Sequence, residues 1–415
     1  MAEPLLTSAD LAMLNGESGE AEVLAMRLLI GLARATRARR LIDVSSAHID
    51  GTLYLGRASL DYAVRLRDLG GRVRVPTTLN VTSLDLLHPE LFRGEARTRA
   101  AAMATIEAYV DMGGRPTWTC APYQLPERPC FGDRVAWGES NAIVFANSVL
   151  GARTPRFGDF VDIAAALAGR APEFGLYLDE NRQAGLCFDV SGIPAHARSG
   201  EQFFAVLGFL VGKEAGTDVP AIISLETATE DELKTLGAAA ATSGSVGMVH
   251  VVGVTPEAPD LESATGGRVP RFVVVGREAL DAAYRSLSTP GSGALRTVNL
   301  GTPHYSESQI ARLADLLGGR LVHERVTLYV NTGRDVLRSA PGVGRLEALG
   351  VTFVVDTCTY VTPIIGDRDG VAMTDSAKWA YYAPGNLGLE VVFGSTSDCV
   401  ESAVAGRVLR ESPPW

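Results

Sequence analysis

The sequence lacks an apolar run long enough to cross a bilayer, which takes roughly 20 consecutive apolar residues. The longest apolar run, residues 203–212, contains two glycines and is followed by Lys213. The opening residues, MAEPLLTSAD, also lack the basic and apolar regions of a secretory signal. We therefore expect a cytoplasmic protein with no membrane partner.

Positive charge is also scarce. The chain has 38 Lys and Arg residues against 48 Asp and Glu, a formal net charge of -10. Nucleic-acid affinity depends largely on cations that neutralise phosphates, so we expect no nucleic-acid partner. The phosphate-binding loop with Gly-Lys-Ser/Thr and a complete dinucleotide-binding fingerprint are missing as well, which argues against ATP and nicotinamide chemistry.

Cysteine is sparse and irregularly spaced. The chain has 5 cysteines, at positions 120, 130, 187, 358 and 399, and none forms the close pairs of a structural zinc site. An odd number without an export signal argues against a disulfide framework. These residues are therefore expected to be free thiols or metal ligands.

What the sequence does contain is typical of a globular α/β protein. Of its 415 residues, 46% are hydrophobic and 21% are charged, enough for two or three domains. From residue 171 onward, apolar strands alternate with helical patterns, which predicts parallel sheets with crossover helices. We predict three regions, namely residues 1–160 with Cys120, residues 161–262, and residues 263–415 with Cys358 and Cys399.

Three cysteines lie among oxygen donors. Cys358 follows an apolar strand in VVDTCTYV, and Cys120 and Cys399 lie in TWTCAPYQ and GSTSDCVESA. Three thiolates can hold an iron-sulfur cluster and leave one coordination position for a substrate, although spacing alone does not establish a shared site. By contrast, Cys187 is expected to be a buried apolar residue, and Cys130 fits either interpretation.

Several long segments resemble the aconitase X family. They include DVSSAHIDGTLYLG, VPTTLNVTSLD, ESNAIVFANSVLGARTPRFGDFVD, DTCTYVTPI and DSAKWAYYAPGNLGLEVVFGSTSDCVESA, in the same order over nearly the whole chain. The resemblance implies an α/β, aconitase-like fold with multiple three-layer α/β/α domains around a central cleft. It also implies stereospecific dehydration, with Cys120, Cys358 and Cys399 binding an iron-sulfur cluster or iron.

The family pairs this region with a small domain of the swivelling type, which supplies a serine proposed as the base. A separate small subunit is therefore expected as the partner. Some relatives carry cysteine where this chain has Thr52 and Thr302, which bears on the metal content.

For catalysis, the residue types suggest two groups. His48 and Asp50 form a candidate acid/base pair on one loop, and Lys378 is a candidate cation for the developing negative charge. Glu139, Ser140 and Asn141 either contact substrate or cap the helix that follows, with Ser140 or Asn141 as the expected cap.

For substrate binding, the candidates lie near strand ends. Thr77, Thr78 and Asn80 are expected just after a strand, and His304 lies at the end of another. Arg153 and Arg156 are candidate carboxylate-binding cations. A single histidine at such a position is more often a hydrogen-bonded buried residue than a catalyst, so both interpretations stay open for His304.

Taken with the resemblance, these features predict a hydro-lyase. Its expected substrate is cis-3-hydroxy-L-proline, dehydrated to Δ1-pyrroline-2-carboxylate. Mevalonate 5-phosphate is the alternative, although a phosphorylated substrate would call for a further basic pocket. Another hydroxylated amino acid, or a binding homologue without catalysis, are the remaining hypotheses.

Overall fold

The computed structural model describes residues 3–289, 291 and 293–415, which form two compact units. Unit 1 comprises the residues up to Leu84 together with Gly94–Gln183, and unit 2 comprises Asp85–Arg93 and Ala184–Trp415. The predicted boundary after residue 160 lies inside unit 1, and the one after residue 262 lies inside unit 2. The division into three regions stays a prediction.

Unit 1 is built on a three-stranded parallel sheet with the strand order β3-β2-β4. These strands are β3 (Thr77–Leu79), β2 (Ser46–Ile49) and β4 (Val135–Trp137), and β1 (Leu41–Asp43) pairs antiparallel with β5 (Arg170–Pro172). The helices are α1 (Ser8–Leu14), α2 (Glu20–Thr36), α3 (Arg57–Asp68), α4 (Ala96–Asp111), α5 (Ser140–Ser148) and α6 (Val161–Ala168). The middle strand β2 therefore places His48 beside Thr78 of β3 and Trp137 of β4.

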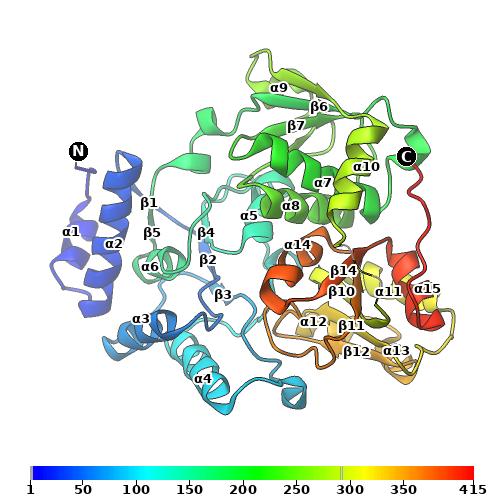
Figure 1. Ribbon diagram of the computed structural model, residues 1–415. Helices are drawn as coiled ribbons and strands as arrows, with labels where there is room; N and C mark the ends of the chain where they lie inside the picture. The colour runs from blue at the N-terminus through cyan, green and yellow to red at the C-terminus, as the bar shows by residue number, and fades with distance from the viewer. Residues whose placement is uncertain (1–2, 290, 292) are drawn as a thin grey trace. The chain divides into compact units, whose positions relative to one another are not determined.

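Unit 2 contains two parallel sheets (Figure 1). The four-stranded sheet has the order β8 (His250–Val251), β7 (Pro220–Ile223), β6 (Leu186–Asp189) and β9 (Arg271–Val274). The five-stranded sheet has the order β12 (Val351–Val354), β11 (Thr327–Thr332), β10 (Leu295–Tyr305), β13 (Val371–Thr374) and β14 (Glu390–Phe393). The helices are α7 (Glu201–Ala215), α8 (Glu230–Ser243), α9 (Leu261–Thr265), α10 (Arg277–Ser286), α11 (Glu307–Leu317), α12 (Arg334–Ser339), α13 (Val343–Ala348), α14 (Ala377–Leu387) and α15 (Thr396–Ala405).

The five-stranded sheet packs on an apolar core in unit 2. Its strands are rich in Val, Leu and Phe, as expected for parallel strands covered on both faces. Val298 and Leu328 of the sheet pack with Ile310 and Leu313 of α11 and with Val400 of α15. This core fixes the strands whose carboxyl ends carry polar side chains.

Helices α7 and α8 pack against each other through glycine. A Cβ atom on Gly208 would lie 2.3 Å from the Leu236 carbonyl oxygen, which is far inside van der Waals contact. The apolar run of residues 203–212 is the buried part of α7. Within the described part of the chain, no helix has both the length and the apolar character needed to cross a membrane.

Replacing Gly208 should therefore destabilise the fold. We expect Gly208→Ala to lower the free energy of unfolding by about 1–3 kcal/mol, because the added methyl group has no space. Gly31→Ala, in the exposed middle of α2 with nothing within 4 Å of the added Cβ, should instead raise it by about 0.5–1 kcal/mol. Urea unfolding measures both, and equal midpoints would contradict the role of close packing at Gly208.

Candidate active site

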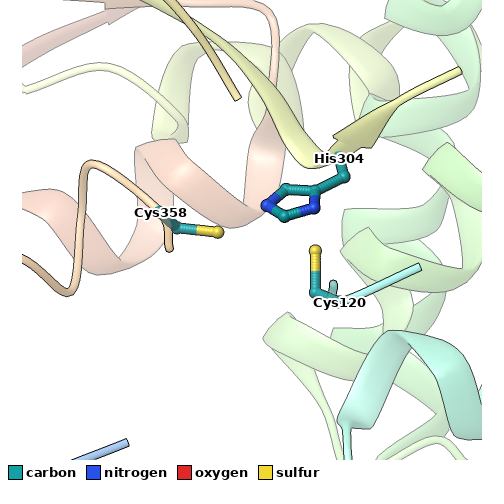
Figure 2. A group of neighbouring side chains, drawn as sticks. All are labelled: Cys120, His304 and Cys358. Carbon is teal, nitrogen blue, oxygen red and sulfur yellow. The ribbon is translucent and has the colours of Figure 1, made fainter. Parts of the chain in front are cut away.

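His304 and Cys358 lie together at the carboxyl edge of the five-stranded sheet. His304 is the next-to-last residue of strand β10, and Cys358 lies in the loop that follows β12. Their donor atoms, an imidazole nitrogen and a sulfur, lie within 4.8 Å of each other, and both residues are buried. Figure 2 shows the thiol of Cys358 directed toward the imidazole ring of His304. These buried N and S donors fit an iron or iron-sulfur centre.

The imidazole of His304 has a defined tautomer. Nε2 lies 3.2 Å from the Thr357 carbonyl oxygen, which can only accept a hydrogen bond, so Nε2 carries the proton and Nδ1 keeps a lone pair. Burial lowers the pKa of His304 to about 4. The ring is therefore neutral at pH 7, the form in which histidine binds metals.

The loop carrying Cys358 is held by a buried ion pair. Asp356 has a φ of 62° and is fully buried, and its carboxylate binds Arg334 through two hydrogen bonds of 2.5 and 2.6 Å. The same carboxylate accepts a bond of 3.1 Å from the Leu86 amide. A bidentate guanidinium and an amide donor offset the cost of burying this charge. The left-handed turn at Asp356 thus sets the path of the chain two residues before the thiol.

Further bonds fix the loop on the other side of Cys358. The Thr359 amide donates to Asn331 Oδ1 at 3.1 Å, and Trp379 Nε1 donates to Thr359 Oγ1 at 3.0 Å. Asn331 lies at the end of β11, and Trp379 lies in α14. The loop is therefore tied to neighbouring elements of unit 2 on both sides of the cysteine.

The remaining cysteines have different surroundings. Cys120 is a buried residue of unit 1, also labelled in Figure 2, and its carbonyl oxygen accepts a bond of 3.0 Å from Asn141. Cys399 lies on α15 in the apolar core of unit 2, where burial raises the pKa of its thiol. Cys187 is fully buried in β6, as expected, and Cys130 is exposed. Metal binding by Cys120 and Cys399 stays a prediction.

In unit 1, the structure gives His48 and Asp50 separate hydrogen-bond partners. His48 Nδ1 lies 2.8 Å from Thr78 Oγ1. The Asp50 carboxylate accepts a hydrogen bond from Asn80, and the Asp50 amide donates to Asp162 Oδ2 at 2.6 Å. The predicted residues His48, Thr78, Asp50 and Asn80 therefore form two adjacent pairs at the ends of β2 and β3.

Burial governs the protonation of this group. It raises the pKa of Asp50 to about 8, with a further contribution from the negative charge of Glu139, and it raises the pKa of Asp162 to about 7. Burial also lowers the pKa of His48 to about 3. At neutral pH the histidine is thus uncharged, and Asp50 retains a proton. A carboxyl group in that state can give or take a proton near pH 7.

Glu139, not Ser140 or Asn141, caps helix α5. Its carboxylate accepts a bond of 2.8 Å from the Ala142 amide and a further bond from the Asn141 side chain. Asn141 Oδ1 in turn accepts a bond of 2.7 Å from the Tyr123 hydroxyl. The expected cap was therefore wrong by one or two residues, because a glutamate side chain reaches the same backbone amides from one position earlier.

The other predicted substrate contacts are more dispersed. Thr77 and Thr78 lie within β3 instead of after a strand, and Thr77 Oγ1 donates to the Val75 carbonyl oxygen at 2.8 Å. Arg153 forms an ion pair of 2.5 Å with Asp179, and Arg156 is exposed. Their role in substrate binding stays a prediction.

Lys378 is buried in the first turn of α14.

Three charged residues that contact residues described above were not predicted, namely Asp162, Arg334 and Lys234. Asp162 carried a signal, because it is a charged residue in the apolar segment FVDIAAALA. Arg334 also carried one, since it lies two residues after the end of the strand TLYVNT. Lys234 is buried although the sequence of its helix is acidic and typical of a solvent-exposed helix. No local pattern therefore predicts its burial.

Comparison with known families covers almost the whole chain. Models of the aconitase X first, second and third domains match residues 4–180, 184–285 and 295–405. The chain belongs to the aconitase X family. The crystal structure of Thermococcus kodakaraensis aconitase X in its holo-form is similar with a TM-score of 0.86 and 33% identity, covering 96% of this chain and 100% of that one. The predicted α/β, aconitase-like fold is confirmed.

Named relatives are dehydratases. The cis-3-hydroxy-L-proline dehydratase of Pseudomonas aeruginosa is 46% identical, and the match covers 100% of this chain and 72% of that protein. The enzyme of the same name from Hypocrea jecorina is 41% identical over 97% of this chain and 69% of its own length. The phosphomevalonate dehydratase large subunit of Methanosarcina mazei is 35% identical, with coverage of 97% and 98%. Dehydratases are hydro-lyases, which is the predicted enzyme class.

The buried carboxyl group of Asp162 predicts a pH-dependent stability. Its folded pKa of about 7 lies above the ordinary value of 3.8, so the stability that it contributes at low pH is lost as pH rises toward 7. Asp162→Asn should therefore gain stability relative to the wild type between pH 5 and pH 8, by at least ~1 kcal/mol. Thermal melts across this range measure it, with the exposed Asp61→Asn as control. A difference that does not change with pH would contradict the prediction.

Proposed function

We propose that this chain is the large subunit of a hydro-lyase that dehydrates cis-3-hydroxy-L-proline to Δ1-pyrroline-2-carboxylate. The observation that supports it most is the 46% identity to the Pseudomonas aeruginosa enzyme of that name over the whole chain. The 41% identity to the Hypocrea jecorina enzyme agrees with it. The cytoplasmic location expected from the sequence stays a prediction.

Mevalonate 5-phosphate is the second candidate substrate. The observation in its favour is the length of the match, which covers 98% of the Methanosarcina mazei large subunit. The identity, however, is 35%, below that of both hydroxyproline enzymes. Another hydroxylated amino acid, or binding without catalysis, would follow only if both substrates failed.

A separate small subunit is the proposed partner. The match leaves out 28% of the Pseudomonas aeruginosa enzyme (100 − 72), and the archaeal relatives are named large subunits. We infer that the missing part corresponds to a small domain of the swivelling type, here supplied by another chain. That domain would also supply the base.

The proposed cofactor is an iron-sulfur cluster or a single iron. Cys358 and Cys120 are the proposed cysteine ligands, with His304 as a further donor beside Cys358 and Cys399 as the third predicted cysteine. When bound, the iron acts as a Lewis acid toward the leaving hydroxyl group. The neutral imidazole and the fixed loop at Asp356 favour ligation, because the donors are held in place before any metal arrives.

Side chains of this chain are proposed for two further tasks of the elimination, namely stabilising the negative charge and protonating the leaving group. Removing a proton beside a carboxylate builds negative charge there, and the buried Lys378 is the proposed cation that stabilises it. A departing hydroxyl group needs a proton. Asp50, which holds one near neutral pH, is the proposed donor, with His48 and Asn80 positioned beside it.

A two-substrate assay tests the activity. The iron-loaded chain, purified with a small-domain chain from the same genome, should turn over cis-3-hydroxy-L-proline with a kcat/KM roughly a hundredfold above that for mevalonate 5-phosphate. Without the small chain, turnover should be lost while the iron stays bound. Activity on the phosphate ester alone would reject the proposed substrate.

Iron and sulfide content test the ligands. We expect Cys120→Ser and Cys358→Ser, purified without oxygen, to lose about tenfold or more of their bound iron, because thiolates are the strong donors. The exposed Cys130→Ser is the matched control and should keep its iron. His304→Ala and Cys399→Ser decide between the imidazole and the core thiol as the third ligand. Full occupancy in both Cys120→Ser and Cys358→Ser would rule out the proposed site.

A further inference from the structure

A small pocket opens at the carboxyl edge of the five-stranded sheet in unit 2. Its walls are the ends of β10 and β13, the start of α14, and helices α7 and α8. The chain passes from β10 outward to β11 and β12, and then returns to β13 on the other side of β10. The pocket therefore lies at the topological switch point of the sheet, where open α/β folds bind their ligands.

One side of the pocket suits a carboxylate. The first turn of α14 carries Lys378 and the backbone amides of a helix N-terminus, which together attract negative charge. Thr302 lines the same pocket, and its hydroxyl group is buried with no hydrogen-bond partner in the described part of the chain. Thr302 is only 5% exposed, so this unmet hydroxyl indicates a bound group that the pocket is built to accept.

The other side of the pocket suits a cation. Glu201 and Asp375 both line it, and both are largely buried. Asp375 accepts hydrogen bonds from the hydroxyl groups of Tyr305 and Thr396, and Glu201 accepts one from Gln309. These neutral donors orient the two carboxyl groups.

Lys234, the second lysine of the pocket, is already engaged. Its ammonium group lies 2.9 Å from Asp231 Oδ1 and also binds the side chain of Gln309. Arg312 forms an ion pair with Glu201 at 3.6 Å. Lys378 and Glu201 are thus a basic and an acidic group on the two sides of the pocket.

We propose that this pocket binds the zwitterionic head of an amino acid. The carboxylate would lie against Thr302, Lys378 and the start of α14, and the ammonium group against Glu201 and Asp375. The inference rests on the proposed function and specifies how its substrate is recognised. Thr302, which would contact the carboxylate, lies two residues before His304 in β10.

Charge complementarity favours a zwitterion over a phosphate ester. An amino acid brings one charge of each sign to a pocket that offers both signs. A phosphate ester brings about two negative charges toward the carboxyl groups of Glu201 and Asp375, and desolvated like charges repel strongly. The pocket therefore discriminates between the two candidate substrates.

Calorimetric titration of the iron-loaded chain with its small chain tests the pocket. L-Proline, which has both charges and no hydroxyl group to eliminate, should bind. N-acetyl-L-proline lacks the ammonium charge and L-prolinamide lacks the carboxylate, and each should bind about tenfold more weakly or worse, as expected when a charged hydrogen-bonding group loses its partner.

Variants assign the two sides. Thr302→Val and Lys378→Met should weaken L-proline binding about tenfold, and Thr302→Ser should restore it because it keeps the hydroxyl group. Glu201→Gln should weaken L-proline but leave N-acetyl-L-proline unchanged. Thr297→Val, at the opposite end of β10, and Lys213→Met, an exposed lysine of α7, are matched controls that should change nothing. Circular dichroism checks that each variant is folded.

Failure of this inference and failure of the proposed function give different results. If cis-3-hydroxy-L-proline is turned over but Thr302→Val, Lys378→Met and Glu201→Gln leave its KM and the L-proline affinity unchanged, the pocket assignment is overturned and the function stands. If only mevalonate 5-phosphate is bound and turned over, both are overturned. A loss of L-proline affinity confined to the pocket variants supports both.

Discussion

Parallel pairing of strands is the constraint on which this structure depends. Because β10, β11, β12 and β13 run in the same direction, their carboxyl ends meet at one edge of a sheet that packs on an apolar core. His304, the loop of Cys358 and the first turn of α14 are gathered there, although up to 74 residues (378 − 304) separate them along the chain. The apolar core holds the strands in place, and the carboxyl edge carries the polar side chains of the candidate site.

Buried ionisable groups in this protein are present in forms whose burial costs little free energy. The imidazoles of His48 and His304 are neutral because burial lowers their pKa, and Asp50 keeps its proton because burial raises its pKa. Where a charge is retained in the interior, as at Asp356, a guanidinium group balances it directly. Burying a charged or polar group costs free energy unless it is neutralised or paired, so buried polar residues take these forms.

The sequence allowed the fold class, the family and the strand leading to Cys358 to be predicted, because apolar strands and long family-specific segments are local patterns. It did not allow the partners of buried charges to be predicted. Lys234 lies in a segment that reads as solvated, and its burial follows from the packing of α7 against α8 and β10. The hydrogen-bond partners of His48 and Asp50, namely Thr78, Asn80 and Asp162, likewise come from other strands and helices, and the role of His48 and Asp50 as an acid/base pair stays a prediction. The cap of α5 was missed by one or two residues, and Thr77 and Thr78 were expected just after a strand and lie within it, which is the usual limit of a local pattern.

The left-handed turn at Asp356 has a consequence for the preorganisation of the Cys358 thiol. A thiol on a flexible loop would have to be ordered each time a ligand binds, which costs conformational entropy. Here the backbone direction is dictated by a guanidinium, a main-chain amide and an asparagine on neighbouring elements, none of which is a donor to metal. The position of the Cys358 thiol is therefore set by the protein itself, before any ligand binds there.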